Sequence, residues 1–195
     1  MQTAATTNGD VRVAIVPFAK HVRVDPATYY NQNWIDWSDW DDDNGQDATT
    51  ITCSTQRTGR SGRSTKRCST STSWVPANHN TWNGCITDRD KDFDTKNTTP
   101  NPADASLSPG QASTMFPAEQ ANDCPAKMMG LSYDWTALKN KVDELQPNGT
   151  TNQPIGLAWA WMALTSGIPL IPPAKTNDTQ QAIILFSDGL NTENR

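Results

Sequence analysis

Apolar residues lie mainly near the two ends of the sequence. Of the 29 Val, Leu, Ile and Phe residues, seven fall in positions 1–24, seven in positions 25–130 and fifteen in positions 131–195. So long a middle stretch with so few aliphatic side chains is uncommon inside a compact domain. The pattern predicts two packed segments, 1–20 and 131–195, separated by a long polar insertion over 21–130.

Two apolar runs in the packed segments predict buried strands, one at residues 11–18 and one at 182–186. Both are rich in large aliphatic side chains and show little polar alternation, which is typical of strands covered on both faces. Pro17 should mark the exit of the first strand.

Two helices are expected in the last third of the chain. Leu138 and Val142 share one face of a predicted helix over 135–145, which Asp134 can cap. A second helix, running from about Pro154 to Gly167, is apolar almost all round and should be buried. Strands and helices in this order indicate an α/β sheet.

The four cysteines all lie in the insertion, and their spacing is not that of a zinc site. Three disulfide pairings are possible. We predict Cys53 with Cys68 and Cys85 with Cys124, because this pairing closes two separate local loops; reduced thiols are the alternative. Disulfides would compensate for a thin core and would place the chain in an oxidising compartment, such as the periplasm or the cell exterior.

The insertion also contains two compositional clusters. Trp34, Trp37 and Trp40 recur every third residue among aspartates, which predicts packing beneath loops; stacking on sugars or on a partner protein is the alternative. Between Ala48 and Ser73, 14 of 26 residues are Ser or Thr, interleaved with Arg and Lys. This composition predicts a solvated loop, with a polyanion grip as the alternative.

Charge and motif content exclude several function classes. The formal net charge is -5 and no long basic tract is present, which argues against binding to duplex nucleic acid. No apolar stretch is long enough to cross a bilayer. No Ser, His and Asp arrangement with an elbow motif and no Gly-rich phosphate loop occurs, so we expect no enzyme activity.

One pair of polar residues flanks predicted elements of the sheet. Thr151 lies just before the second helix, and Asp188 lies just beyond the strand over 182–186. Because ligands of open α/β sheets bind outside the carboxyl ends of strands, this hydroxyl and this carboxylate could share a small cation. Oxygen ligands of this kind suit Mg²⁺.

The sequence resembles von Willebrand factor A domains, and more closely those of bacterial TadG-like proteins of tight-adherence (Flp) pilus assembly. The resembling stretches appear in the family's order and include a Cys-bearing part of the insertion; they cover 11–26, 82–90, 116–120, 131–161 and 182–195. The resemblance implies a partial von Willebrand factor A fold. Such a fold is α/β and Rossmann-like, with a mostly parallel sheet, here interrupted by a long, disulfide-linked, loop-rich insertion.

In the family, a metal-ion-dependent adhesion site combines a D-x-S-x-S motif with a later Thr and a later Asp, which Thr151 and Asp188 resemble. The implied ion is Mg²⁺, with Ca²⁺ or Mn²⁺ as alternatives. No D-x-S-x-S precedes Val11, so the chain looks like a fragment in which metal binding should be weak. The same letters at 104–108 lack a leading apolar strand, and we read them as chance.

The function implied by the resemblance is a non-enzymatic protein-binding or adhesion module of a pilus assembly protein. Its expected place is the bacterial cell envelope, on the periplasmic or extracellular side of the inner membrane, held there by an anchor that this sequence lacks. The alternative is a structural scaffold with an idle metal site, whose Trp-rich insertion binds a protein or a glycan.

Overall fold

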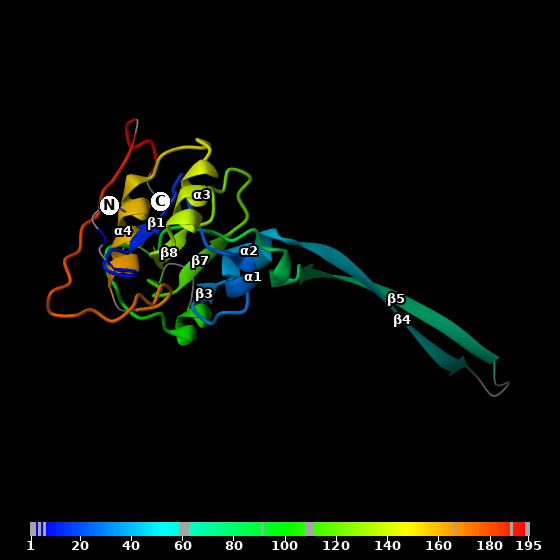
Figure 1. Cartoon of the computed structure of the whole chain (residues 1–195). Coiled ribbons are helices and arrows are strands. Elements are labelled where there is room, and N and C mark those ends of the chain that lie inside the picture. The colour runs from blue at the N-terminus through cyan, green and yellow to red at the C-terminus, as the bar shows by residue number, and fades with distance from the viewer. Residues whose placement is uncertain are drawn as a thin grey trace.

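A four-stranded sheet covered by one helix organises the fold. The computed structural model describes residues 3, 5, 7–58, 63–90, 92–107, 111–165, 167–187 and 189–193. A rounded body carries a long two-stranded arm that projects to one side (Figure 1). Within the described residues, no helix has the length and apolar character needed to cross a membrane.

The central sheet is mixed. Its strand order is β2-β6-β7-β3, with β2 and β7 each antiparallel to β6 and with β3 parallel to β7. The strands are very short, at two to four residues each. Their bounds are β2 Val22–Arg23, β3 Ile35–Asp36, β6 Cys85–Ile86 and β7 Phe116–Glu119.

Two further sheets have two strands each. In the body, β1 (Val13–Ile15) pairs antiparallel with β8 (Met129–Ser132). The arm consists of β4 (Gly45–Thr58) and β5 (Arg63–Pro76), which pair antiparallel along their whole described length. We call residues 45–58 and 63–76 the arm throughout.

Helices are few and mostly short. The short ones are α1 (Pro26–Tyr29), α2 (Ser38–Asp43) and the 3-10 helices η2 (His79–Thr81) and η3 (Pro102–Ser106). The longer ones, α3 (Trp135–Asp143) and α4 (Gln153–Leu164), confirm the two predicted helices, although α4 ends three residues before Gly167. The Asp134 carboxylate caps α3 as expected, because it accepts hydrogen bonds from two backbone amides of the first turn at 3.0 Å.

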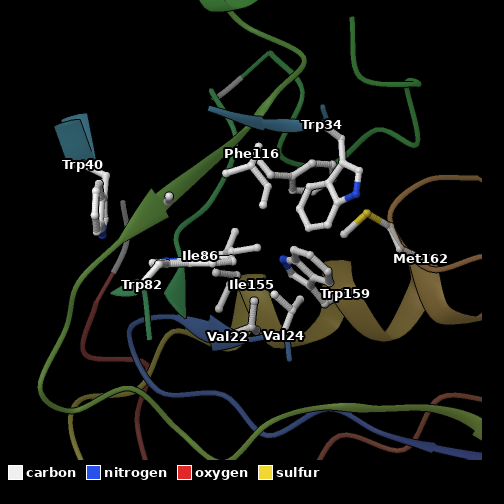
Figure 2. Packing of buried hydrophobic residues seen from close by; sticks show 12 residues of the cluster. Val22, Val24, Trp34, Trp40, Trp82, Ile86, Phe116, Ile155, Trp159 and Met162 are labelled. Carbon is white, nitrogen blue, oxygen red and sulfur yellow. The ribbon is translucent and has the colours of Figure 1, made fainter. Parts of the chain in front are cut away.

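The core lies between α4 and the central sheet (Figure 2). Ile155, Trp159 and Met162 of α4 point toward the aromatic and aliphatic side chains of the sheet. The rings of Phe116 and Trp159 lie 5.1 Å apart. Leu157 and Trp161, on the opposite side of α4, are 46% and 37% exposed, so the expectation that this helix is buried all round is wrong.

The predicted Rossmann-like, mostly parallel sheet is also wrong. The strand expected at 11–18 is reduced to β1, whose partner β8 is antiparallel, and all four strands of the central sheet come from residues 21–130. This part of the chain builds a core despite its shortage of aliphatic residues because tryptophans replace them. Trp34, Trp40 and Trp82 are each at most 3% exposed.

The strand predicted at 182–186 does not form. These residues pair with no strand in the described part of the chain, and Phe186 is 82% exposed. They line one side of an apolar cavity of about 720 Å³, whose other walls come from β1 and α4. A strand needs a neighbouring strand to satisfy its backbone groups, and β1 pairs only with β8 in the described part of the chain.

Arg89 fixes the long loop between β6 and β7. Its side chain is 3% exposed and donates hydrogen bonds to the backbone carbonyls of Thr98 at 2.8 Å, of Thr114 at 3.0 Å and of Lys96. The guanidinium also lies 4.5 Å from the centre of the Phe116 ring. The Asp104 carboxylate accepts hydrogen bonds from the amide and hydroxyl of Thr114, which is a structural role for the first residue of the chance D-x-S-x-S match.

Candidate functional site

The amino end of α4 carries the first predicted site residue. Thr151 is half-buried, and the residue that caps the helix is its neighbour Asn152, which is 1% exposed. The Asn152 side-chain oxygen accepts a hydrogen bond from the Ile155 amide at 3.2 Å, and its side-chain nitrogen donates to Asp88 at 2.9 Å. Asn152 was not among the predicted site residues, although Asn two residues before Pro154 is a typical cap signal.

Described residues that follow the second predicted site residue, Asp188, lie against Thr151. The Thr151 amide donates to the Thr192 hydroxyl at 2.9 Å, and the Thr151 carbonyl accepts from the amides of Thr192 and Glu193. Asp188 itself lies outside the described residues. Its neighbours on either side, Ser187 and Gly189, accept hydrogen bonds from the Gln153 side chain at 3.2 Å.

The described residues supply only part of a metal site. The Thr151 side chain is an oxygen donor, but no group of three or more His, Cys, Asp or Glu that could hold an ion occurs within the described ranges. The nearby Thr192 hydroxyl and the Asn191 side-chain oxygen accept hydrogen bonds from the backbone amides of residues 151 and 153. On this geometry the loop over α4 completes a helix cap, and metal binding at Thr151 and Asp188 stays a prediction.

His21 lies buried near the amino end of α4, where the backbone carbonyl of Ala19 accepts a hydrogen bond from the Asn152 amide. It is 6% exposed, and its Nδ1 atom has no hydrogen-bond partner among the described residues. Burial lowers the pKa of His21 below its ordinary value, and the charge of Lys20 acts in the same direction. The carboxylates of Asp123 and Glu193 oppose this shift. His21 is therefore held in its neutral form at neutral pH.

The arm is the most exposed regular element of the molecule. Every side chain over 49–57 and 64–76 is exposed, and a strand pair of 14 residues each spans about 45 Å. Both faces are polar, since the Ser- and Thr-rich composition continues on either side of the ribbon. The prediction of a solvated segment is confirmed, but the segment is a regular hairpin and not a loop.

Two features stiffen the arm. Cys53 lies opposite Cys68 in the ladder, and the two form a disulfide with a Cα–Cα distance of 4.0 Å. At the base, the Trp74 indole donates to the backbone carbonyl of Asp41 in α2 at 2.7 Å. The ring lies so close over Gly45 that a Cβ there would come within 2.8 Å of it.

An aromatic cluster supports the base from the body side. The His79 ring stacks on Trp37 at 3.8 Å, and His79 Nε2 lies 2.8 Å from an Asp41 carboxylate oxygen. Trp40 and Trp82 pack edge-on against Trp37. Trp40 and Trp82 are buried, Trp37 and His79 are half-buried, and the rings contact one another. The structure therefore favours the packing interpretation of the tryptophan cluster over a sugar-stacking surface.

The second predicted disulfide, Cys85–Cys124, lies in the body and joins β6 to the chain after β7. Cys85 is fully buried. Both predicted pairings are thus present, and no free cysteine occurs in the described residues. Two disulfides in one small chain point to an oxidising compartment outside the cytoplasm.

Charge separates the arm from the body. Residues 48–73 contain five Arg or Lys and no Asp or Glu, so the remaining residues carry 11 basic against 21 acidic groups, a net charge of -10. Exposed aspartates gather at the base of the arm, at Asp39, Asp42, Asp43 and Asp47. The described basic side chains Arg57, Lys66 and Arg67 are exposed in the outer half of the arm.

No family model, no curated protein and no solved structure matches this chain. Its function is therefore inferred from its own residues.

Proposed function

We propose that the chain is a non-enzymatic protein-binding module that works outside the cytoplasm, and that the arm is its contact element. The observation that carries this proposal is the exposure of a long, disulfide-linked hairpin with 14 residues in each strand. An isolated two-stranded hairpin is at best marginally stable in water. Here a disulfide, together with the aromatic cluster where the arm joins the body, keeps the hairpin extended, although its side chains do not contribute to the core.

The composition of the arm supports a protein as its partner. Open strand edges offer backbone N–H and C=O groups to another chain. No aromatic side chain lies in residues 48–73, so the arm lacks the stacking platforms with which single-stranded nucleic acids are usually bound. Paired carboxylates on a fixed framework, as sugar hydrolysis requires, are likewise not part of the arm.

The compartment follows in finer detail from the resemblance to TadG-like proteins. We place the module in the bacterial cell envelope, on the periplasmic or extracellular side of the inner membrane. A role in tight-adherence pilus assembly would give the arm a protein partner in that compartment. The two disulfides agree with this location.

Site-specific photo-crosslinking in the native host tests the proposal. A crosslinker at Thr50, which is exposed in β4, should trap a protein, whereas one at Lys139, which is exposed on α3, should not. Because Asp47 and Trp74 are ladder partners, residues 48–73 can be replaced by an Asn-Gly turn that keeps the base of the hairpin. Binding should then be lost while the body stays folded. Crosslinks from Lys139 alone, or binding that survives the deletion, would contradict the proposal.

A second candidate is metal-dependent adhesion at the amino end of α4. It is supported by the hydrogen bonds that join Ser187 and residues 189–193 to Thr151 and Gln153. Calorimetric titration of the chain with Mg²⁺ should then show binding that Thr151→Ala removes and that Thr136→Ala, a change at an exposed Thr of α3, leaves intact. Absence of heat with Mg²⁺, Ca²⁺ and Mn²⁺ would exclude this candidate for the chain.

A further inference from the structure

One edge of the arm is open for pairing. The arm is a two-stranded sheet, and no third strand flanks β4 or β5 in the described part of the chain. The two edges differ in charge. Strand β5 carries Lys66 and Arg67 between its ends and has Pro76 as its last residue. Charged side chains and proline are residue types that protect an edge strand from association. Strand β4 contains no proline, and its two charged residues, Asp47 and Arg57, lie near opposite ends.

The backbone of β4 presents both charged residues at outward-facing positions. The Cα–Cα distance of 4.0 Å between Cys53 and Cys68 marks a pair without ladder hydrogen bonds, which in antiparallel sheets is the narrow type. At such positions the N–H and C=O groups point away from the ladder partner. Asp47 and Arg57 are six and four residues from Cys53, so they share its orientation. In agreement, the carbonyls of Thr52 and Gln56, at alternate positions, accept hydrogen bonds from β5 hydroxyls.

These positions fit one particular register with a second copy of the strand. When two β4 strands lie antiparallel with Thr52 of each at the centre, Asp47 of one copy stands opposite Arg57 of the other. The twofold symmetry repeats this ion pair, and both pairs fall on outward-facing backbone groups. The tip of each arm then lies beside the acidic α2 end of the other.

Charge complementarity favours a second copy as the occupant. Within one molecule the basic outer half of the arm projects away from the acidic body, so that it cannot satisfy the body's charge (Figure 1). Antiparallel arms bring each basic half against an acidic base. A third and fourth strand also relieve the marginal stability of a two-stranded ribbon.

We infer that β4 of one molecule pairs edge to edge and antiparallel with β4 of a second copy, with Asp47 of each molecule opposite Arg57 of the other. This inference rests on the proposed function of the arm as a protein contact and names its partner. Both faces of the ribbon are polar, so the contact buries little apolar surface. The dimer is therefore weak and salt-sensitive.

Sedimentation of the full oxidised chain over a concentration series tests the inference. At low ionic strength we expect a monomer–dimer equilibrium, which shifts to monomer in about 1 M salt, where the Debye length is about 3 Å. Asp47→Arg and Arg57→Asp should each weaken the dimer about tenfold, because like charges then face each other twice. Lys175→Asp, a charge change on an exposed body residue, is the control and should have no effect.

Mixing the two variants provides the sharper experiment. In an equimolar mixture, the arginine introduced at position 47 of the first variant faces the carboxylate introduced at position 57 of the second, so a heterodimer should form with restored affinity. The double variant Asp47→Arg/Arg57→Asp should also dimerise. Because both sites are exposed, unchanged circular dichroism is expected for every variant.

The inference fails if the chain is monomeric at all concentrations, or if the single variants dimerise as well as the parent. A monomer that binds a single-stranded DNA oligonucleotide through Arg57 would also overturn it. If crosslinks from Thr50 trap a different protein and the chain stays monomeric, only this inference falls. If the chain dimerises as described and crosslinks to an outside partner arise from Lys139 instead, the inference stands and the arm contacts only a second copy, so the part of the proposed function that gives the arm an outside partner falls.

Discussion

The two disulfides should affect stability in different parts of the molecule. Cys53–Cys68 links two strands whose side chains are exposed, whereas Cys85 is fully buried beside β2 and β7. We therefore expect the double variant Cys53→Ala/Cys68→Ala to loosen the arm and leave the free energy of unfolding of the body unchanged. The variant Cys85→Ala/Cys124→Ala should destabilise the body itself.

The loop lengths set the magnitudes. The cysteines of the arm are 15 residues apart and those of the body 39 residues apart. Loop-closure entropy makes such cross-links worth about 3 and about 4 kcal/mol. For the arm, this stabilisation belongs to a local opening reaction, because the core residues lie elsewhere. For the body, the full amount should appear in global unfolding, together with about 1 kcal/mol for the packing lost at Cys85.

Urea unfolding followed by tryptophan fluorescence reports on the body, because Trp74 is the only one of the eight tryptophans that lies in the arm. Hydrogen exchange of the β4 and β5 amides reports on the arm. The arm variant should keep the parent's unfolding midpoint and exchange faster between residues 48 and 73. If it lowers global stability as much as the body variant does, the arm is part of the cooperative unit and the reasoning is wrong.

Three further predictions concern single residues. Arg89→Met should reduce the free energy of unfolding by about 4 kcal/mol in urea titrations, because three backbone carbonyls lose a charged donor, while Arg57→Met at an exposed site should change it little. Gly45→Ala should destabilise the base of the arm by about 2 kcal/mol, since its Cβ would meet the Val75 carbonyl at 2.5 Å; faster exchange of the β5 amides near Trp74 would show it. The His21 pKa is lowered in the folded state, so below about pH 6.5 the unfolded chain binds a proton that the folded chain does not. The free energy of unfolding should therefore decrease as the pH is lowered from about 6.5 to the pKa of His21 in the folded state. His21→Phe should flatten this part of the pH–stability curve; an identical slope in both proteins would exclude His21 as its source.

The sequence allowed the helices and disulfides to be predicted because their determinants are local. Asp134 and Pro154 mark helix starts through hydrogen bonding and backbone geometry within one turn. Likewise, Cys53 and Cys68 are close in sequence, so a short hairpin brings them together at small entropic cost. For α4, however, periodicity alone did not distinguish the buried face from the side that exposes Leu157 and Trp161.

The central sheet could not be predicted in the same way. Its strands have two to four residues, too few for a period of two to be visible, and Pro117 lies inside β7. The arm was missed for another reason, since a strand pair with two solvated faces shows no apolar alternation. Its available signal was the abundance of Thr, a residue that favours strands, on both sides of a Gly- and Arg-rich stretch of sequence.

The candidate site residues were expected to meet because the elements that carry them would lie side by side in one sheet. Thr151 and the neighbours of Asp188 do meet, although the strand that was expected to bring them together does not exist in the described part of the chain. Hydrogen bonds between residues 151 and 153 on one side and Ser187 and residues 189–193 on the other bring them together instead. The contact of Thr151 with this part of the chain therefore has a different structural cause from the predicted one, and the pairing of Thr151 with Asp188 itself stays a prediction.

The energetic separation of arm and body bears directly on the proposed function. A hairpin whose side chains face solvent adds almost nothing to the folding of the body, yet ordering its two strands of 14 residues removes much conformational freedom. The Cys53–Cys68 disulfide reduces this loss before any partner arrives, because it restricts the open arm as well as the closed one. A partner that pairs with β4 then meets a strand already extended, and the affinity is not reduced by ordering it. Removing the disulfide should therefore weaken any contact of the arm, even with Asp47 and Arg57 intact.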